Sequence, residues 1–231
     1  MKTVHVLVVG AFVVSACSKP ATPADAANAG KTSMSAHATA DTDKNVAGGS
    51  IPAGYIARTD RTNAPVSGAK YTASGDGWEV TTGPAHIVYA TKDLGNGNYT
   101  ATATFDQLQA PAHPEAFGIF IGGMHLDQPN LAYTYFLVRS TGEVLVKLRD
   151  GVSTRDIIPW TMNADVPKQD ASGKATYALS ATVTNDAIKF SVNGKQVASV
   201  SKVGLPTDGI AGVRVNHNLH VKVSPISIKA P

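Results

Sequence analysis

The sequence AYTYFLVRSTGEVLVKLRDG, residues 132–151, decides the fold class of this chain. Two runs rich in β-branched and aromatic residues flank the polar tetrad Ser-Thr-Gly-Glu at 140–143, a pattern typical of a β-hairpin. Side chains alternate along each run, so the hairpin has one apolar face and one face that mixes apolar residues with two cations. Such a pair fits the middle of a two-sheet sandwich, with one face in the core and the other lining a groove.

The predicted register places Arg139 opposite Val144 and assigns each side chain of the hairpin to a face. On this register the apolar face contains Tyr133, Tyr135, Leu137, Val146 and Leu148. The groove face contains Thr134, Phe136, Val138, Leu145, Lys147 and Arg149.

Short strands separated by Gly, Pro and Asn turns follow one another from residue 70 onward. The nearly all-apolar run 117–121 predicts a central strand that is covered on both faces. Residues 152–167 are predicted to form a loop beside the groove, and residues 210–215 and 219–228 to form the last hairpin. No segment has a helical period over a useful length, so we predict an all-β protein, an antiparallel jelly-roll sandwich of two sheets.

Composition bounds the class of protein. With 231 residues, the chain has room for one domain of ordinary size and some extra sequence. Its hydrophobic content of 43% and charged content of 16% suit a globular β domain. The formal net charge of +3 is small and spread along the chain, which argues against a nucleic-acid surface.

The N-terminal residues resemble a bacterial lipoprotein leader. Lys2 precedes an apolar run at 4–14 that is too short to span a bilayer, and the run ends in Val-Ser-Ala-Cys at 14–17. This pattern resembles a lipobox, which implies that residues 1–16 are a signal peptide and that Cys17 carries the lipid. Cys17 is the chain's single cysteine, so it forms no internal disulfide. We therefore expect a protein anchored to a membrane of the bacterial cell envelope, facing the periplasm or the cell surface.

Three segments follow from this division. Residues 1–16 are the leader, and residues 17–50, rich in Ala, Ser, Thr and Gly, form a lipidated flexible tether. Residues 51–231 form the β-sandwich domain. The sequence makes no prediction of the oligomeric state or of the membrane that holds the lipid.

Four segments carry a family resemblance: YFLVRSTGEVLVKLRDG at 135–151, IPWT at 158–161, IKFSVNGKQV at 188–197 and GIAGVRVNHNLHVKV at 209–223. Through them the chain resembles the concanavalin A-like lectin/glucanase (LamG-like) jelly rolls. More narrowly, it is similar to bacterial 3-keto-disaccharide hydrolase-like domains. The resemblance covers about residues 78–228 and implies a jelly-roll fold, with either glycan binding or cleavage of a 3-keto-glycoside.

The carboxylates of a glucanase are missing. Glucanases of this superfamily carry acidic residues in an E-x-D-x-x-E pattern on one strand, because residues two apart share a face. The glutamates of this chain, Glu79, Glu115 and Glu143, are far apart in sequence, and no two acidic residues of the domain are spaced two apart. The sequence also lacks a Gly-x-Ser-x-Gly elbow, so it identifies no catalytic residues.

Metal ligands are not predicted either. His217 and His220 invite a zinc interpretation, but residues three apart on a strand face opposite ways, and a third ligand would have to come from His86, His113 or His125. The loop DLGNGN at 93–98 offers oxygen donors for calcium but few carboxylates, and we interpret it as a turn. We therefore expect no cofactor, with calcium as the alternative.

The remaining candidate is a glycan-binding groove formed by Phe136, Lys147 and Arg149 on the hairpin, with Arg155, Trp160 and His125 on adjoining loops. Rings stack against sugars, and cations donate hydrogen bonds to hydroxyl and carboxylate groups. Three functions stay open: glycan binding without turnover, hydrolysis or elimination on a 3-keto-glycoside, and adhesion to a protein partner. A carboxylate within hydrogen-bond reach of a histidine would favour the enzyme. An aromatic platform without acids would favour the lectin, and a broad apolar patch would favour the protein partner.

Overall fold

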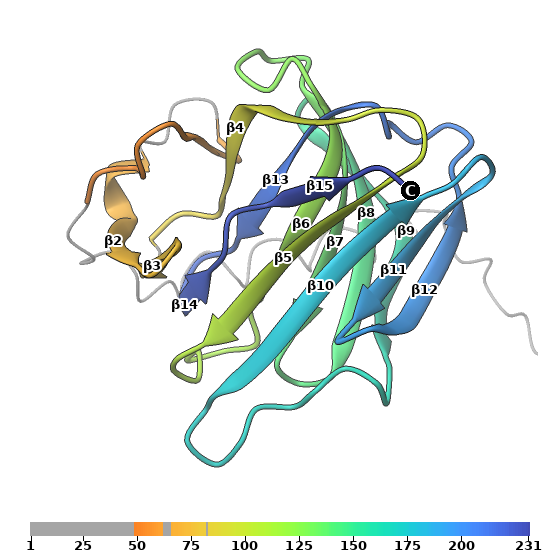
Figure 1. The fold of residues 1–231 in the computed structure, drawn as a ribbon. Helices are drawn as coiled ribbons and strands as arrows, with labels where there is room; N and C mark the ends of the chain where they lie inside the picture. Colours follow the sequence, from red (N-terminus) through yellow and green to blue (C-terminus); the bar gives the residue numbers. More distant parts are fainter. Residues whose placement is uncertain (1–48, 62–65, 82) are drawn as a thin grey trace, which may run out of the picture. The chain divides into compact units, whose positions relative to one another are not determined.

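A computed structural model describes residues 49–61, 66–81 and 83–231 (Figure 1). Apart from the short 3-10 turn η3, Val66–Gly68, the regular structure of these residues is β-strand. No helix in this part of the chain is long and apolar enough to cross a bilayer. The predicted leader, the predicted lipidation site Cys17 and almost all of the predicted tether lie outside the described residues.

Two antiparallel sheets form the domain, as predicted. The seven-stranded sheet has the order β1-β4-β13-β6-β7-β8-β9 and contains β1 (Ile56–Thr59), β4 (His86–Gly95), β6 (Ala116–Met124), β7 (Ala132–Arg139), β8 (Glu143–Asp150), β9 (Ser153–Met162) and β13 (Gly209–Val215). The eight-stranded sheet has the order β12-β11-β10-β5-β14-β3-β2 and contains β2 (Lys70–Ser74), β3 (Gly77–Thr81), β5 (Tyr99–Gln107), β10 (Ala175–Val183), β11 (Ala187–Val192), β12 (Lys195–Ser201) and β14 (His220–Val223), with β15 (Ser227–Lys229) also pairing with β5.

Aromatic side chains join the sheets across the interior. Phe117 of β6 stacks on Phe105 of β5, with ring centroids 5.1 Å apart, and meets Tyr177 of β10 edge-on. Along β5 and β10, buried residues alternate with partly exposed ones, as expected for strands with one face in the core. Strand β6 is buried along nearly its whole length, which confirms the prediction of a central strand covered on both faces.

Two segments differ from the prediction. Residues 153–162 form strand β9 rather than a loop, and Pro159 fits there because β9 is an edge strand. The predicted last hairpin is wrong, because β13 belongs to one sheet and β14 to the other. The turn that follows Val215 therefore carries the chain between the sheets, and residues 224–226 separate β14 from β15.

Candidate functional site

The register of the central hairpin differs by one residue from the predicted register. Arg139 pairs with Glu143 rather than Val144, because the connection is the three-residue loop 140–142. Gly142 has a φ of +98°, a backbone conformation that glycine adopts far more readily than residues with a Cβ. A shift of one residue exchanges the faces of one strand relative to the other. Tyr133 therefore lies opposite Arg149, and Tyr135 opposite Lys147.

Phe136 is not a groove residue, which corrects the prediction. It pairs with Val146 on the inner face, is fully buried, and stacks on Phe190 of the eight-stranded sheet with ring centroids 4.9 Å apart. Its role is to fill the space between the sheets. In its place, Tyr133 and Tyr135 share the outer face of the seven-stranded sheet with Lys147 and Arg149.

That outer face carries a second apolar cluster, separate from the core between the sheets. We call it the outer-face cluster; it contains Ile87, Tyr89, Ala116, Phe120, Leu126, Leu131, Tyr133, Tyr135, Leu137 and Leu145, with Trp160 and Ile210 packed against it. Its tyrosines and Phe120 touch through tilted rings, with the Tyr133 centroid 5.1 Å from that of Phe120 and 5.5 Å from that of Tyr135. The outer face therefore carries rings and cations, but Phe120, Tyr133 and Tyr135 are buried, so these rings do not form the accessible aromatic platform that was predicted for the groove.

Trp160 lies in strand β9, on the side of the outer-face cluster, and is half-buried. The guanidinium carbon of Arg139 lies 3.7 Å from the centroid of its ring, a close cation–π contact. Arg155 is exposed on the same strand but pairs with Leu148, on the opposite face from Lys147 and Arg149. Its predicted place in the groove is therefore wrong, because β9 is a strand whose side chains alternate.

His125 is exposed in the segment between β6 and β7, with a φ of +50°. Its backbone carbonyl accepts a hydrogen bond from the amide of Gln128, and the following residue, Leu126, is buried in the outer-face cluster. Arg58 donates to the carbonyls of Leu126 and Gln128 and fixes this turn. His125 is therefore the exposed member of an ordered turn beside the cluster.

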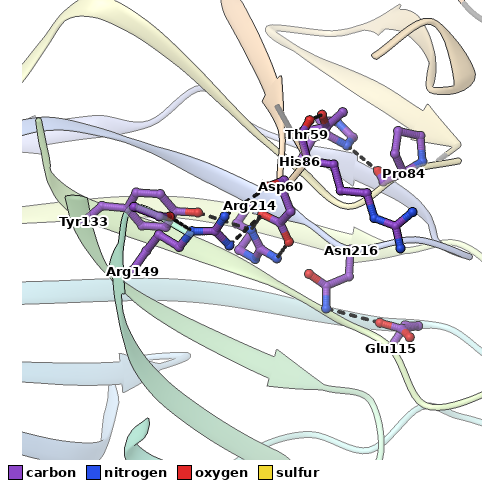
Figure 2. A network of polar contacts seen from close by, with 11 residues as sticks. Thr59, Asp60, Pro84, His86, Glu115, Tyr133, Arg149, Arg214 and Asn216 are labelled. Carbon is purple, nitrogen blue, oxygen red and sulfur yellow. Dashed lines mark hydrogen bonds and ion pairs between the residues drawn. The ribbon is translucent and has the colours of Figure 1, made fainter. Parts of the chain in front are cut away.

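Arg149 and Arg214 share an acidic partner that the sequence did not suggest (Figure 2). Both oxygens of the Asp60 carboxylate accept from Arg214, at 2.7 and 2.6 Å, and Arg214 also donates to the Tyr133 hydroxyl at 3.3 Å. Arg149 donates to the backbone carbonyls of Asp60 and Gly151, and its guanidinium lies 3.7 Å from the Asp60 carboxylate. Asp60 thus lies against the face that carries both arginines.

Electrostatics keep this cluster charged. Burial alone would raise the pKa of Asp60, but the charge and hydrogen bonds of Arg214, with the charge of Arg149, outweigh burial and hold that pKa below its ordinary value. Arg149 and Arg214 are both almost fully buried. Buried cations need such compensation, so Arg149 is engaged by groups of its own domain and is less available to a ligand than predicted.

Lys147 remains partly accessible and pairs with Asp156 of β9, with 2.9 Å between Nζ and Oδ1. Both members of the pair are partly solvated. On the outer face, Asp60, Glu143 and Asp156 are each paired with a cation, Glu143 with Arg139 at 3.9 Å. This arrangement does not resemble the active site of a glucanase, in which two carboxyl groups flank the scissile bond.

A second polar cluster lies where β6 begins and β13 ends. Oε1 of Glu115 lies 3.3 Å from Nδ1 of His113 and 2.9 Å from Nε2 of His217. Its Oε2 accepts a hydrogen bond from the Asn216 side chain at 3.2 Å (Figure 2). The pKa of Glu115 is lowered, because the hydrogen bond and charge of His217 outweigh the burial that would raise it. We call these three residues, His113, Glu115 and His217, the histidine–glutamate cluster.

The structure separates the histidines that the zinc interpretation considered together. His220 lies 2.5 Å from Glu79 rather than beside His217. His86 is fully buried; its Nδ1 contacts the Pro84 carbonyl and its Nε2 contacts the Tyr71 hydroxyl. Of the three histidines considered as a third ligand, His113 lies beside His217, and Glu115 contacts both.

The predicted DLGNGN loop is partly strand. Asp93–Gly95 end β4, and the rest of the segment is held by the Gly97 amide donating to Asp208 and by Asn98 donating to Asn185. These contacts describe a turn. They bring the side chains of Asn98 and Asn185 together. Among the hydrogen bonds of the described residues, Asp208 is the carboxylate that another part of the chain contributes to this segment.

Comparison with solved structures identifies the architecture. No family model matches the sequence, and no curated protein matches it. The carbohydrate-binding module CBM66 from Bacillus subtilis superposes with a TM-score of 0.56 at 10% identity, over 77% of this chain and 96% of that chain. The exoplasmic/lumenal domain of VIP36, in a Ca²⁺- and mannose-bound form, superposes with a TM-score of 0.55 at 8% identity, over 81% and 88%. The domain therefore has the concanavalin A-like jelly-roll fold, with two antiparallel sheets.

A Bacillus subtilis protein of unknown function with a galectin-like fold also superposes, with a TM-score of 0.51 at 10% identity over 75% of this chain and 88% of that chain. Sequence identities of this size show a shared fold and carry no residue-by-residue correspondence. Any ligand-binding function must therefore follow from the chain's own side chains.

Proposed function

We propose that this jelly roll is a carbohydrate-binding module of the bacterial cell envelope, held at a membrane by a lipid on Cys17. The observation that carries the proposal is the Arg139–Trp160 pair on the outer face of the seven-stranded sheet. The proposed ligand is an envelope glycan, which the module binds without turning it over.

Trp160 suits a sugar ring because its indole is half-buried, so part of its surface remains accessible while its position is fixed by packing. Arg139 stacks on the ring and brings guanidinium donors next to it. One row further along the same face lies the partly exposed Lys147–Asp156 pair, which offers a donor and an acceptor. A ring beside both kinds of hydrogen-bonding group matches the mixed surface of a sugar.

The solved structures support the same class of ligand. One of the similar folds is named as a carbohydrate-binding module and another was solved with mannose. They support the choice of glycans as the first ligands to test.

A glycan array tests this proposal. The full-length chain, labelled and applied to an array of bacterial envelope and plant glycans, is expected to be retained by a restricted set of sugars. The same sugars are expected to raise its melting temperature, because a ligand that binds the native state stabilises it. Retention by no glycan, together with no thermal shift in a sugar screen, would contradict the proposal.

A second candidate function is elimination or hydrolysis on a 3-keto-glycoside. The observation that favours it is the Glu115 carboxylate within 2.9 Å of His217, since a histidine oriented by a carboxylate can act as a general base. The base would remove the acidified proton beside the ketone. Incubating the full-length chain with a 3-keto-disaccharide and following the free sugars by NMR distinguishes turnover from binding, and Glu115→Gln should abolish any turnover.

A further inference from the structure

The histidine–glutamate cluster contains the donor set that zinc prefers. It offers two imidazole nitrogens and one carboxylate oxygen, the ligand types of a His₂Glu zinc site. Among the described residues, this is the group of three such side chains close enough to share an ion, with its ligand atoms all within 4.8 Å of one another.

Two of the three ligand-atom separations can be compared with those around a tetrahedral ion. Ligand atoms about 2.0–2.2 Å from zinc lie roughly 3.3–3.6 Å from one another in a tetrahedron. The Glu115–His113 separation of 3.3 Å falls in this range. The Glu115–His217 separation of 2.9 Å is shorter, so those two atoms would move apart by about half an ångström to admit the ion.

The surroundings hold the glutamate in place. Glu115 is almost fully buried, and the Asn216 side chain donates to Oε2, the oxygen that does not face His113 and His217. A hydrogen bond to the outer oxygen of a ligating carboxylate fixes its orientation, as is common around zinc.

The backbone brings the three residues together. The Asn216 amide donates to the Ala116 carbonyl at 3.0 Å and extends the pairing of β13 with β6 to the residues that flank Glu115 and His217. An ion at this place would tie the segment that precedes β6 to the connection between β13 and β14, and so would link the two sheets at one end.

We propose that His113, Glu115 and His217 bind one zinc ion. The ion has three protein ligands, which leave one position of a tetrahedron for water. This site shares no residue with the proposed glycan-binding surface, which is formed by Arg139, Trp160, Lys147 and Asp156.

Metal titration of the full-length chain tests the site. After removal of metal with EDTA, Zn²⁺ is titrated calorimetrically and Co²⁺ is titrated with visible absorption as the readout. One equivalent of each ion is expected to bind, and Co²⁺ should give the visible bands of a low-coordinate site. A Cys17→Ser variant should behave in the same way, which excludes the chain's one thiol as the source.

His113→Asn, His217→Asn and Glu115→Gln are each expected to weaken zinc binding by at least about tenfold. The matched control is His220→Asn, which removes a histidine that is also paired with a glutamate but has no second histidine in its pair. It should leave the affinity and the Co²⁺ spectrum unchanged. Melting temperatures measured without metal identify any variant that fails to fold. If Glu115→Gln fails to fold, the more conservative Glu115→Asp replaces it.

Three results would overturn the proposal: no binding above the level of the His113→Asn variant, a Co²⁺ spectrum of six-coordinate aqueous type, or equal losses in the His220→Asn control. Each would mean that the histidine–glutamate cluster is a hydrogen-bonded cluster that holds no ion.

Discussion

Asp60 and Arg214 lie 154 positions apart in the sequence and form a two-pronged ion pair on the outer face of the seven-stranded sheet. Arg214 is nearly fully buried there, and Arg149 and Tyr133 complete its surroundings. The pair ties the end of β1 to the middle of the sheet, so the face proposed to bind a glycan is held in shape by its own charges.

Loss of the Asp60 carboxylate should destabilise the domain. Asp60→Asn leaves the buried Arg214 charge without its counter-ion, and we expect the free energy of unfolding to fall by about 3 kcal/mol. Urea denaturation measures the change. The control is Asp156→Asn, which removes the solvated partner of Lys147 and should cost less than about 1 kcal/mol. Equal effects of the two substitutions would show that Asp60 is not essential to the cluster.

The observed register predicts that Phe136 and Lys147, which the sequence-based register places on one face, contribute very differently to stability. Phe136→Ala removes a fully buried ring from the core and should cost about 3–5 kcal/mol. Lys147→Ala removes a partly exposed side chain and should change stability by about 1 kcal/mol at most. Thermal and urea unfolding compare the two variants. A small effect of Phe136→Ala would restore the predicted register.

Acid should destabilise the domain through His86. Burial, and then the nearby charge of Arg214, lowers the pKa of His86 from 6.5 to about 4, although the Pro84 carbonyl and Asp60 oppose the shift. Between these two values the unfolded chain binds more protons, so stability rises with pH. The contribution of His86, about 3 kcal/mol, is lost as the pH falls from about 6.5 to about 4.

NMR titration of the His86 ring checks this directly, and the ring should stay neutral down to about pH 4. His86→Gln should flatten the dependence of stability on pH in this window, whereas the control His125→Asn, at an exposed position that tolerates asparagine, should not. Protonation of His86 near pH 6.5 in the folded protein would refute the assignment.

The sequence predicted the fold class because its signals are local. The alternation on both sides of residues 140–143 identifies a hairpin without reference to the rest of the chain. The predicted register of the hairpin was wrong because the sequence Ser-Thr-Gly-Glu allows either a three-residue or a four-residue connection, and these differ by one residue in register. Gly142 was the available signal, since glycine is favoured at the last position of a three-residue loop. Strand β9 was predicted to be a loop partly because it contains Pro159, and proline is compatible with both a loop and an edge strand.

The polar clusters could not be predicted, because their members come from distant segments. Arg214 lies in the apolar strand GIAGVRV, which indicates that it needs a buried partner, but nothing near it points to Asp60. Glu115 and His217 meet only because β6 and β13 are neighbours in the sheet. Glu115, which has His113 two positions away in the sequence, is therefore joined by a second histidine only in the folded chain.

The affinity of the Trp160→Ala variant for a glycan selected on the array tests the central claim most directly. Isothermal titration should show binding weakened by about tenfold or more, with the melting temperature of the unliganded chain little changed. The control Arg155→Ala, on the same strand but on the opposite face, should bind as the unaltered chain does. Unchanged affinity in Trp160→Ala, or an equal loss in Arg155→Ala, would contradict a binding site on the outer face of the jelly roll.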